Sequence, residues 1–214
     1  TRDNKTGLMW EVKTTDKGLR DKNWTYTWFD GFSNGELGAE HPEYCNWSLQ
    51  LCNTSEYQNM VNSYALCGAS DWRLPSRTEL MGLIYCSDGK YSNLISATDY
   101  AICSSNVNDK LVTKSPTINS TYFPNTVNDW YWSSTIDEKD QTSSWNVYFD
   151  KGYSYYDKQT FNDYVRLVRE DRYIKISNKG ATLPNSAVLG SGANDWACTR
   201  DNKTGLVWEL KTDD

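Results

Sequence analysis

Catalysis would need a general base or a nucleophile, and the sequence offers few candidates for either role. Its one histidine, His41, stands before Pro42 in a turn-rich stretch with no nucleophile motif around it, although a Ser-His-Asp or Cys-His site would have to use it. The neighbours Asp137 and Glu138 could serve glycoside hydrolysis, but adjacent charges in a turn usually face solvent and do not give the required separation of two carboxyl groups. The phosphate-binding patterns G-x-x-x-x-G-K-[ST] and G-x-G-x-x-G are both absent from the sequence. These residues predict a protein that is not an enzyme.

Six cysteines form the next group of candidates, for metal binding or for disulfides. They lack the paired C-x-x-C spacing of a zinc site, so disulfides are the better interpretation. Six cysteines permit fifteen pairings, and all of them stay open here. Disulfides persist in oxidising surroundings, which predicts a cell-surface, periplasmic or extracellular location. The disulfide candidates are Cys45, Cys52, Cys67, Cys86, Cys103 and Cys198.

Calcium is the one cofactor that the loops suggest. Hard oxygen ligands occur at Asn106, Asn108 and Asp109, and again at Asn128 and Asp129. No EF-hand or other spaced ligand series accompanies them. We therefore expect no cofactor, with structural calcium as a weak alternative.

Composition and charge narrow the choice of partners. A net charge of -6 and a pI near 4.9 would repel nucleic acid and anionic membranes. No apolar run approaches membrane-spanning length, and no basic-then-apolar leader is present, so neither membrane insertion nor a signal peptide is expected in this chain. The mean hydropathy is only -0.75, but 10 Trp, 15 Tyr and 5 Phe can build a compact aromatic core.

A long internal repeat sets the domain organisation. The segment TRDNKTGLMWEVKT at residues 1–14 returns as TRDNKTGLVWELKT at residues 199–212, with changes only at Met9 and Val12. Its Asp-Asn-Lys-Thr-Gly turn and Leu-x-Trp alternation predict the opening hairpin of a module that the parent protein carries at least twice. Residues 170–198 then form an inter-module hairpin or linker. Residues 199–214 begin a second repeat, which either stays disordered or adds a strand to an open sheet edge.

The elements between the two repeats run from helices to strands. Apolar spacing over residues 47–66 predicts a helix that begins near Ser55 and Glu56. A second helix is predicted after Pro75 by a capping box of Ser76 and Glu79. The residues after Cys86 are loop-like to about Asn128, and YWSST, SSWNVYFD, GYSYYDK and DYVRLVR then predict strands. This order favours an α+β architecture.

Several of these motifs together carry a resemblance to a family. GLMWEVK, ASDWRLPSRTELMGLI, YFPNT, YWSST, WNVYF and DYVRLVR follow the order seen in the Lcl C-terminal domain family. The resemblance covers residues 1–169 and restarts at 199. It implies a disulfide-stabilised C-type lectin-like fold, with two helices packed on a mainly antiparallel twisted sheet. It also implies a bacterial adhesin or another secreted or surface-attached protein, of a domain type whose function is unknown.

The motif DWRLPSRTEL also resembles the helix start of formylglycine-generating enzymes, which modify sulfatases. Those enzymes need two reactive cysteines late in the domain, but no cysteine lies between Ser104 and Ala197. An enzyme related to the formylglycine-generating enzymes is therefore the least favoured function for this chain. We interpret the motif as structural, with Trp72 and Leu74 in the core and Arg73 paired with a carboxylate such as Glu79. The structural residues are Trp72, Arg73, Leu74, Pro75, Glu79 and Trp132.

The segment 135–164 is the predicted binding face. Tyr, Trp, Ser and Asn give binding surfaces a large contact area with little entropy lost, and the segment resembles the diversified ligand-contacting region of retroelement-targeted proteins. In the alternative interpretation, every second residue merely fills one face of a sheet, because strands alternate with period two. The ligand-binding candidates are Trp145, Tyr153, Tyr155, Tyr156, Asp157 and Lys158.

Two functions follow from these features. The first is an adhesion module of a tandem-repeat surface protein that binds carbohydrate or protein on another surface, with avidity from linked copies. The second is a structural repeat of an extracellular stalk or filament, in which residues 199–212 add a strand to a neighbouring copy. Sulfated glycans, which are associated with the family, would need a basic patch that this acidic chain is not expected to have.

Overall fold

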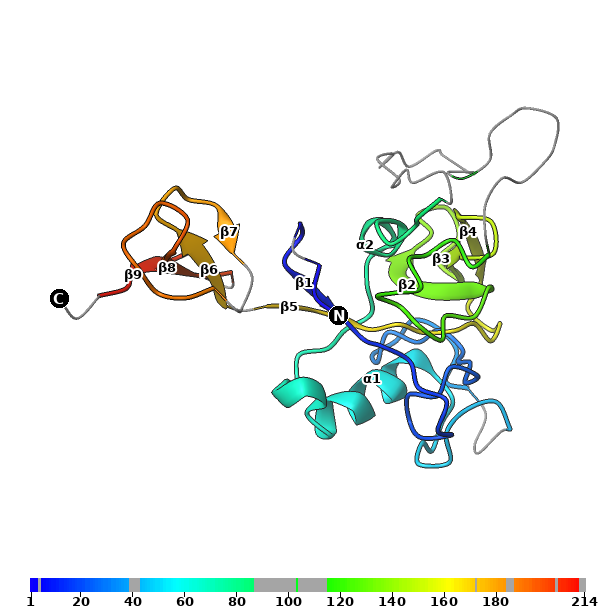
Figure 1. Cartoon of the computed structure of the whole chain (residues 1–214). Coiled ribbons are helices and arrows are strands. Elements are labelled where there is room, and N and C mark those ends of the chain that lie inside the picture. Colours follow the sequence, from blue (N-terminus) through cyan, green and yellow to red (C-terminus); the bar gives the residue numbers. More distant parts are fainter. Residues whose placement is uncertain are drawn as a thin grey trace. The chain divides into compact units, whose positions relative to one another are not determined.

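The structure is a computed structural model in which the chain forms two units (Figure 1). Glu11–Leu167 form the larger unit, here called the body, and Thr1–Trp10 with Val168–Asp214 form the small unit. The description covers residues 1–3, 5–38, 43–86, 103, 115–171, 173–183, 187–202 and 204–211.

Two short helices lie in the described part of the body. Helix α1, Thr54–Ser63, begins at Asn53, whose side chain accepts a hydrogen bond from the backbone of Glu56 and so satisfies one free N–H group of the first turn. Helix α2, Arg77–Met81, begins at the capping box of Ser76 and Glu79 that the sequence predicts. A 3-10 turn at Leu66–Gly68 follows α1. Both α-helices therefore start where side chains close the first turn.

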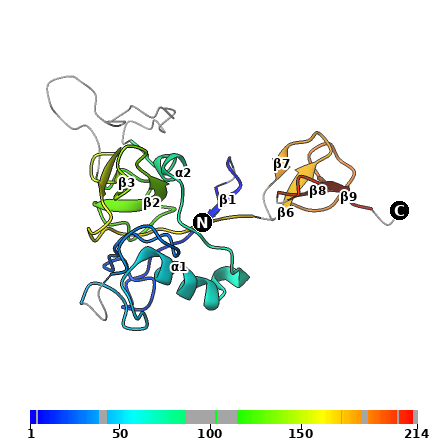
Figure 2. The same ribbon diagram turned by 180° about the vertical axis from the view of Figure 1, so that it is seen from behind.

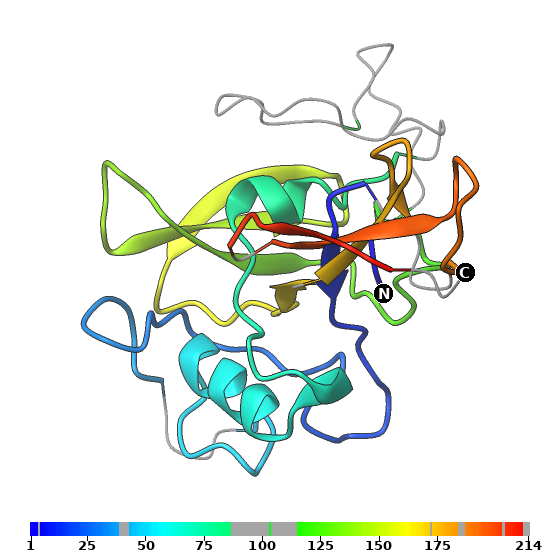
Figure 3. The ribbon, with the colours of Figure 1, turned by 90° about the vertical axis from the view of Figure 1, so that its left-hand side faces the viewer.

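The body also holds a three-stranded antiparallel sheet in the order β2-β3-β4. Its strands are β2 (Trp130–Ile136), β3 (Ser143–Tyr148) and β4 (Tyr153–Lys158). Helix α2 packs against one face of this sheet (Figure 3). Mainly antiparallel sheets with two short helices make up the described chain, as the α+β prediction requires.

The core of the body is aromatic, as the composition predicts. Its buried indole N–H groups donate to backbone carbonyls, from Trp28 to Ser133 at 2.8 Å and from Trp132 to Tyr26 at 2.8 Å. Large rings can be buried in this way without leaving their polar atom unsatisfied. The largest fully buried side chains in the body include Trp28, Trp72, Trp132, Tyr26, Tyr57, Tyr131, Phe149 and Arg166.

The small unit consists of a two-stranded and a four-stranded antiparallel sheet. Strand β1 (Leu8–Trp10) pairs with β5 (Val168–Glu170). The other sheet has the order β7-β6-β8-β9 (Figures 1 and 2), from β6 (Tyr173–Ser177), β7 (Thr182–Leu183), β8 (Trp196–Asp201) and β9 (Val207–Glu209). The second copy of the repeat is therefore ordered over its described residues, and β9 is an edge strand.

Four cysteines form two disulfides, Cys45–Cys52 and Cys86–Cys103. Cys67, which is exposed, and Cys198, which is half-buried, are free thiols. Four of the six disulfide candidates are therefore paired within this chain. Within the described residues, no helix combines the length and the hydropathy that crossing a bilayer requires.

Candidate functional site

Four aromatic side chains lie side by side on one face of the β2-β3-β4 sheet. The strand register places Trp130 opposite Tyr148, Tyr148 opposite Tyr153, and Asn146 opposite Tyr155. Alternate residues share a face, so Trp130, Tyr148, Tyr153 and Tyr155 point the same way. We call these four residues the aromatic row.

The rings of the aromatic row contact one another but remain partly accessible. Trp130 stacks on Tyr148 with centroids 4.4 Å apart, and meets Tyr153 edge-on at 5.4 Å and Tyr155 at 6.4 Å. Tyr155 is 40% exposed, and the other three side chains are half-buried. Mutual packing holds the rings in place, so a ligand could bind them with little further loss of rotamer freedom.

Carboxylates flank the aromatic row. Burial and the negative charges of Asp150 and Asp129 raise the pKa of Tyr148. Burial, Asp157 and Asp150 raise the pKa of Tyr153 in the same way. The phenols therefore stay neutral at physiological pH and can donate hydrogen bonds, while the carboxylates accept them.

A buried polar layer fixes one end of the row. The amide of Asn146, on the same face, donates to the carboxylates of Asp157 at 2.7 Å and Asp163 at 2.9 Å. Burial raises the pKa of Asp163 to about 7, against the hydrogen bond from Asn146 that lowers it, and the charge of Asp157 raises it further. Asp157 is thus engaged in holding β4 to β3.

The six predicted ligand-binding residues do not share one face. Tyr153, Tyr155 and Asp157 lie on the face of the aromatic row, whereas the register places the other three on the opposite face, where Arg77 of α2 covers Trp145. The period-two alternation of strand residues therefore divides the six predicted residues between the two faces of the sheet. The residues on the second face are Trp145, Tyr156 and Lys158.

On the second face, Trp145 and Tyr156 are half-buried by contacts within the body, whereas Lys158 is exposed. The guanidinium of Arg77 lies 3.6 Å from the ring centroid of Trp145 and donates to the Ser154 hydroxyl at 2.9 and 2.7 Å. Tyr156 meets the Trp145 ring edge-on at 5.4 Å. Because β4 is an edge strand of the sheet, the Tyr156 ring also stacks on that of Tyr155 at 4.8 Å and so borders both faces. The ammonium of Lys158 pairs with Asp140 at 2.6 Å. Trp145 is therefore a packing residue that joins α2 to the sheet.

Trp130 and Tyr148 belong to the row but were not among the predicted residues. These two residues could be found in the sequence only by pairing the predicted strands, because no local motif marks them. Tyr148 and Tyr153 flank the short turn between β3 and β4, so antiparallel pairing must place them opposite each other. Counting alternate residues outward from that turn identifies Tyr148, Tyr153 and Tyr155 together.

The DWRLP motif has structural contacts. Arg73 donates to both carboxylate oxygens of Glu79, at 2.8 and 2.7 Å. Burial opposes the ionisation of Glu79, but the hydrogen bonds from Arg73 and Ser76 hold its pKa below the usual value. The Pro75 carbonyl accepts from Ser134 of β2 at 2.7 Å, and Trp72 is 2% exposed. These contacts fix the start of α2 against the sheet.

Other candidate positions show no assembled site in the described chain. Asp129 accepts a hydrogen bond from the backbone of Trp130, and Asn128 contacts Asp150 at 3.5 Å. The described residues contain no group of three His, Cys, Asp or Glu side chains that could hold a metal ion. Asp137 is buried while Glu138 is exposed, so the solvent-facing pair expected at this turn does not form. The candidates His41, Asn106, Asn108 and Asp109 lie outside the described residues.

Comparison with known proteins gives one family. The model of the Lcl C-terminal domain matches residues 1–169, the range over which the resemblance was expected. Neither the curated proteins nor the solved structures contain a match. The match spans the body and the first strands of the small unit, so the chain belongs to the Lcl C-terminal domain family.

Proposed function

We propose that this chain is a ligand-binding module of a bacterial surface protein, with a C-type lectin-like fold, that adheres to a carbohydrate or protein on another surface. The observation that carries the proposal is the aromatic row, four partly exposed rings on one sheet face. Such rings offer contact area at low entropic cost, which is why binding surfaces are enriched in them. The proposal needs neither enzymatic activity nor a cofactor.

The charge around the row limits the ligand class. Trp130 and the tyrosines present ring faces, and Asp129, Asp150 and Asp157 lie close enough to affect the tyrosine pKa values. Aromatic faces beside carboxylates favour neutral or cationic groups. A neutral glycan, or a protein segment carrying lysine or arginine, fits this surface better than a sulfated glycan or a nucleic acid.

An extracellular or cell-surface location fits the covalent structure. Two disulfides are formed within the body, and disulfides are rare where thiols are kept reduced. Adhesion to an external surface is a function of that location. We therefore place the module outside the cytoplasm, without insertion into the membrane.

Arrays of glycans and of extracellular proteins test the proposal. The double variant Tyr153→Ala, Tyr155→Ala removes half of the row. Phe32→Ala is the matched control, because Phe32 is 91% exposed and lies outside the row. We expect the double variant to lose binding by about tenfold or more, as for interface hot spots. The Phe32→Ala control should bind like wild type, both in the presence and in the absence of the metal chelator EDTA. Absence of binding by the folded wild-type chain would overturn the proposal.

A second candidate function is a structural repeat of an extracellular stalk or filament. One observation favours it: the second copy of the repeat forms an exposed edge hairpin in which Leu206, Val207 and Trp208 are 56%, 52% and 45% exposed. Exposed apolar edge strands are sites where another chain can pair. In this function, neighbouring copies of the module are the partners.

A further inference from the structure

The two copies of the repeat fold into the same local hairpin. In the first copy, the N–H of Gly7 donates to the Asp3 carbonyl at 2.8 Å, and Arg2 pairs with Met9. In the second copy, the N–H of Gly205 donates to the Asp201 carbonyl at 2.8 Å, and Arg200 pairs with Val207. The turn is therefore encoded by the repeated residues themselves.

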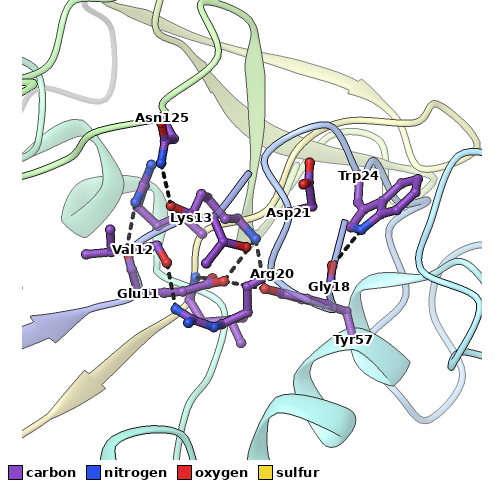
Figure 4. Close-up of polar contacts among 12 residues, drawn as sticks. Glu11, Val12, Lys13, Gly18, Arg20, Asp21, Trp24, Tyr57 and Asn125 are labelled. Atoms are coloured by element: carbon purple, nitrogen blue, oxygen red, sulfur yellow. Dashed lines mark hydrogen bonds and ion pairs between the residues drawn. The ribbon is translucent and has the colours of Figure 1, made fainter. Parts of the chain in front are cut away.

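The residues after the first hairpin are buried in the body (Figure 4). Glu11 and Lys13 are 1% and 3% exposed, and their charged groups lie 3.0 Å apart. Tyr57 donates to the Glu11 carboxylate and accepts from Lys13 at 2.8 Å. The N–H of Leu167 donates to the other Glu11 oxygen at 2.9 Å. Each charge therefore has partners that offset the cost of burial.

The body also holds the backbone of this segment. The Glu11 N–H donates to the Leu167 carbonyl at 2.9 Å, and Arg166 donates to the Glu11 carbonyl at 2.6 Å. Arg20 donates to the Val12 carbonyl at 2.7 Å, and Asn125 to the Lys13 carbonyl at 3.0 Å. The residues that receive the strand are Arg20, Tyr57, Asn125, Arg166 and Leu167, and we call them the strand socket.

The same residue types in the second copy are exposed. Glu209 and Lys211 pair with each other at 2.7 Å, with side chains 70% and 82% exposed. Trp208 is 45% exposed, whereas its counterpart Trp10 is 2% exposed. Strand β9 of the second copy thus carries the same residue types that fill the strand socket, but it lies at a sheet edge with its apolar residues exposed.

We propose that residues 199–211 of one copy bind the strand socket of a second copy of this module, where they replace residues 1–13. Glu209 takes the place of Glu11, and Lys211 takes the place of Lys13. The only differences between the segments, Met9 to Val207 and Val12 to Leu210, exchange one apolar side chain for another. Because donor and socket are different surfaces, the contact is head-to-tail and can join many copies in a row.

The test compares three full-length chains by sedimentation velocity over a range of concentrations. The double variant Glu11→Ala, Lys13→Ala weakens the binding of the chain's own residues 1–13 to the strand socket. Residues 199–211 of another copy should then bind the socket and give dimers and longer oligomers. Adding Glu209→Ala and Lys211→Ala should abolish them. Wild type should form fewer oligomers than the double variant, because its own strand competes. A folded double variant that stays monomeric at every concentration would overturn the proposal.

A peptide covers the case in which the double variant does not fold. A synthetic peptide with the sequence of residues 199–212 should then restore its circular dichroism. The same peptide with both Glu209→Ala and Lys211→Ala should act at least about 100-fold more weakly, because the Leu167 N–H and the Tyr57 hydroxyl of the strand socket would be buried without their partners. If neither peptide restores folding, or both do so equally, the strand socket does not recognise the repeat and the proposal fails.

Discussion

At the residue scale, Glu11 and Lys13 form a charged pair that is almost fully buried in the body. Burial lowers the pKa of Lys13 to about 8, although Glu11 raises it. Between about pH 8 and pH 10.5, Lys13 is therefore protonated in the unfolded chain and neutral in the folded chain. The contribution of Lys13 to stability falls as pH drops through this window and does not change further below it.

We expect Glu11→Ala to reduce the free energy of unfolding by about 3–5 kcal/mol, the usual cost of breaking a buried pair by removing one partner. Urea unfolding at pH 7 measures it. Glu138→Ala is the control, since Glu138 is exposed, and we expect it to stay within about 0.5 kcal/mol of wild type. An equal effect of the two substitutions would show that Glu11 contributes no more than a surface residue.

Asp163 gives a prediction with the opposite dependence on pH. Its pKa rises from 3.8 to about 7 on folding, chiefly because of burial. The folded state therefore binds the extra proton, and its stability falls by up to about 4 kcal/mol as pH rises from about 4 to 7. Asp163→Asn mimics the protonated form and keeps an acceptor for Asn146. We expect it to match wild type at pH 4 and to unfold at higher urea concentration at pH 8. Parallel pH profiles of the two proteins would contradict this.

At the element scale, the turn between β3 and β4 depends on one glycine. Gly152 has φ +72°, and a Cβ there would lie 2.8 Å from Cys103 Sγ and 3.0 Å from Ile84 Cγ2. Gly68 has a similar φ of +74° but open space around it. We expect Gly68→Ala to cost about 1 kcal/mol from the backbone alone, and Gly152→Ala about 1–3 kcal/mol more from overpacking. Thermal unfolding of both variants separates the two costs, and equal melting temperatures would rule out the steric contribution.

At this scale, an element can be predicted from the sequence when the residues that form it lie close together along the chain. The capping box of Ser76 and Glu79 lies within four residues, so the start of α2 could be predicted. The repeated hairpin is equally local. The aromatic row could be predicted only in part, because Trp130 joins it through pairing with Tyr148, 18 residues on. The strand socket could not be predicted, since Glu11 meets Tyr57 and Leu167 across 46 and 156 residues.

At the scale of the whole molecule, the chain carries two distinct surfaces. The aromatic row belongs to the body, and the exposed repeat belongs to the small unit. In the proposed function the first surface binds a ligand, and in our further proposal the second surface links copies. Together they would let several weak sites act at once. Linked sites gain avidity without new contacts. A chain with Glu209→Ala and Lys211→Ala should therefore bind an isolated ligand like wild type but a dense ligand surface less tightly, as measured by surface plasmon resonance at two ligand densities.

The most direct test of the aromatic row is hydroxyl-radical footprinting of the wild-type chain, with and without the ligand that the arrays select. Oxidation should fall at Trp130 and Tyr155 when the ligand binds. It should not change at Phe32, Trp47 or Tyr122, which are 91%, 70% and 58% exposed and lie outside the row. Protection of those three residues, with Trp130 and Tyr155 oxidised as before, would place the ligand elsewhere and contradict the account.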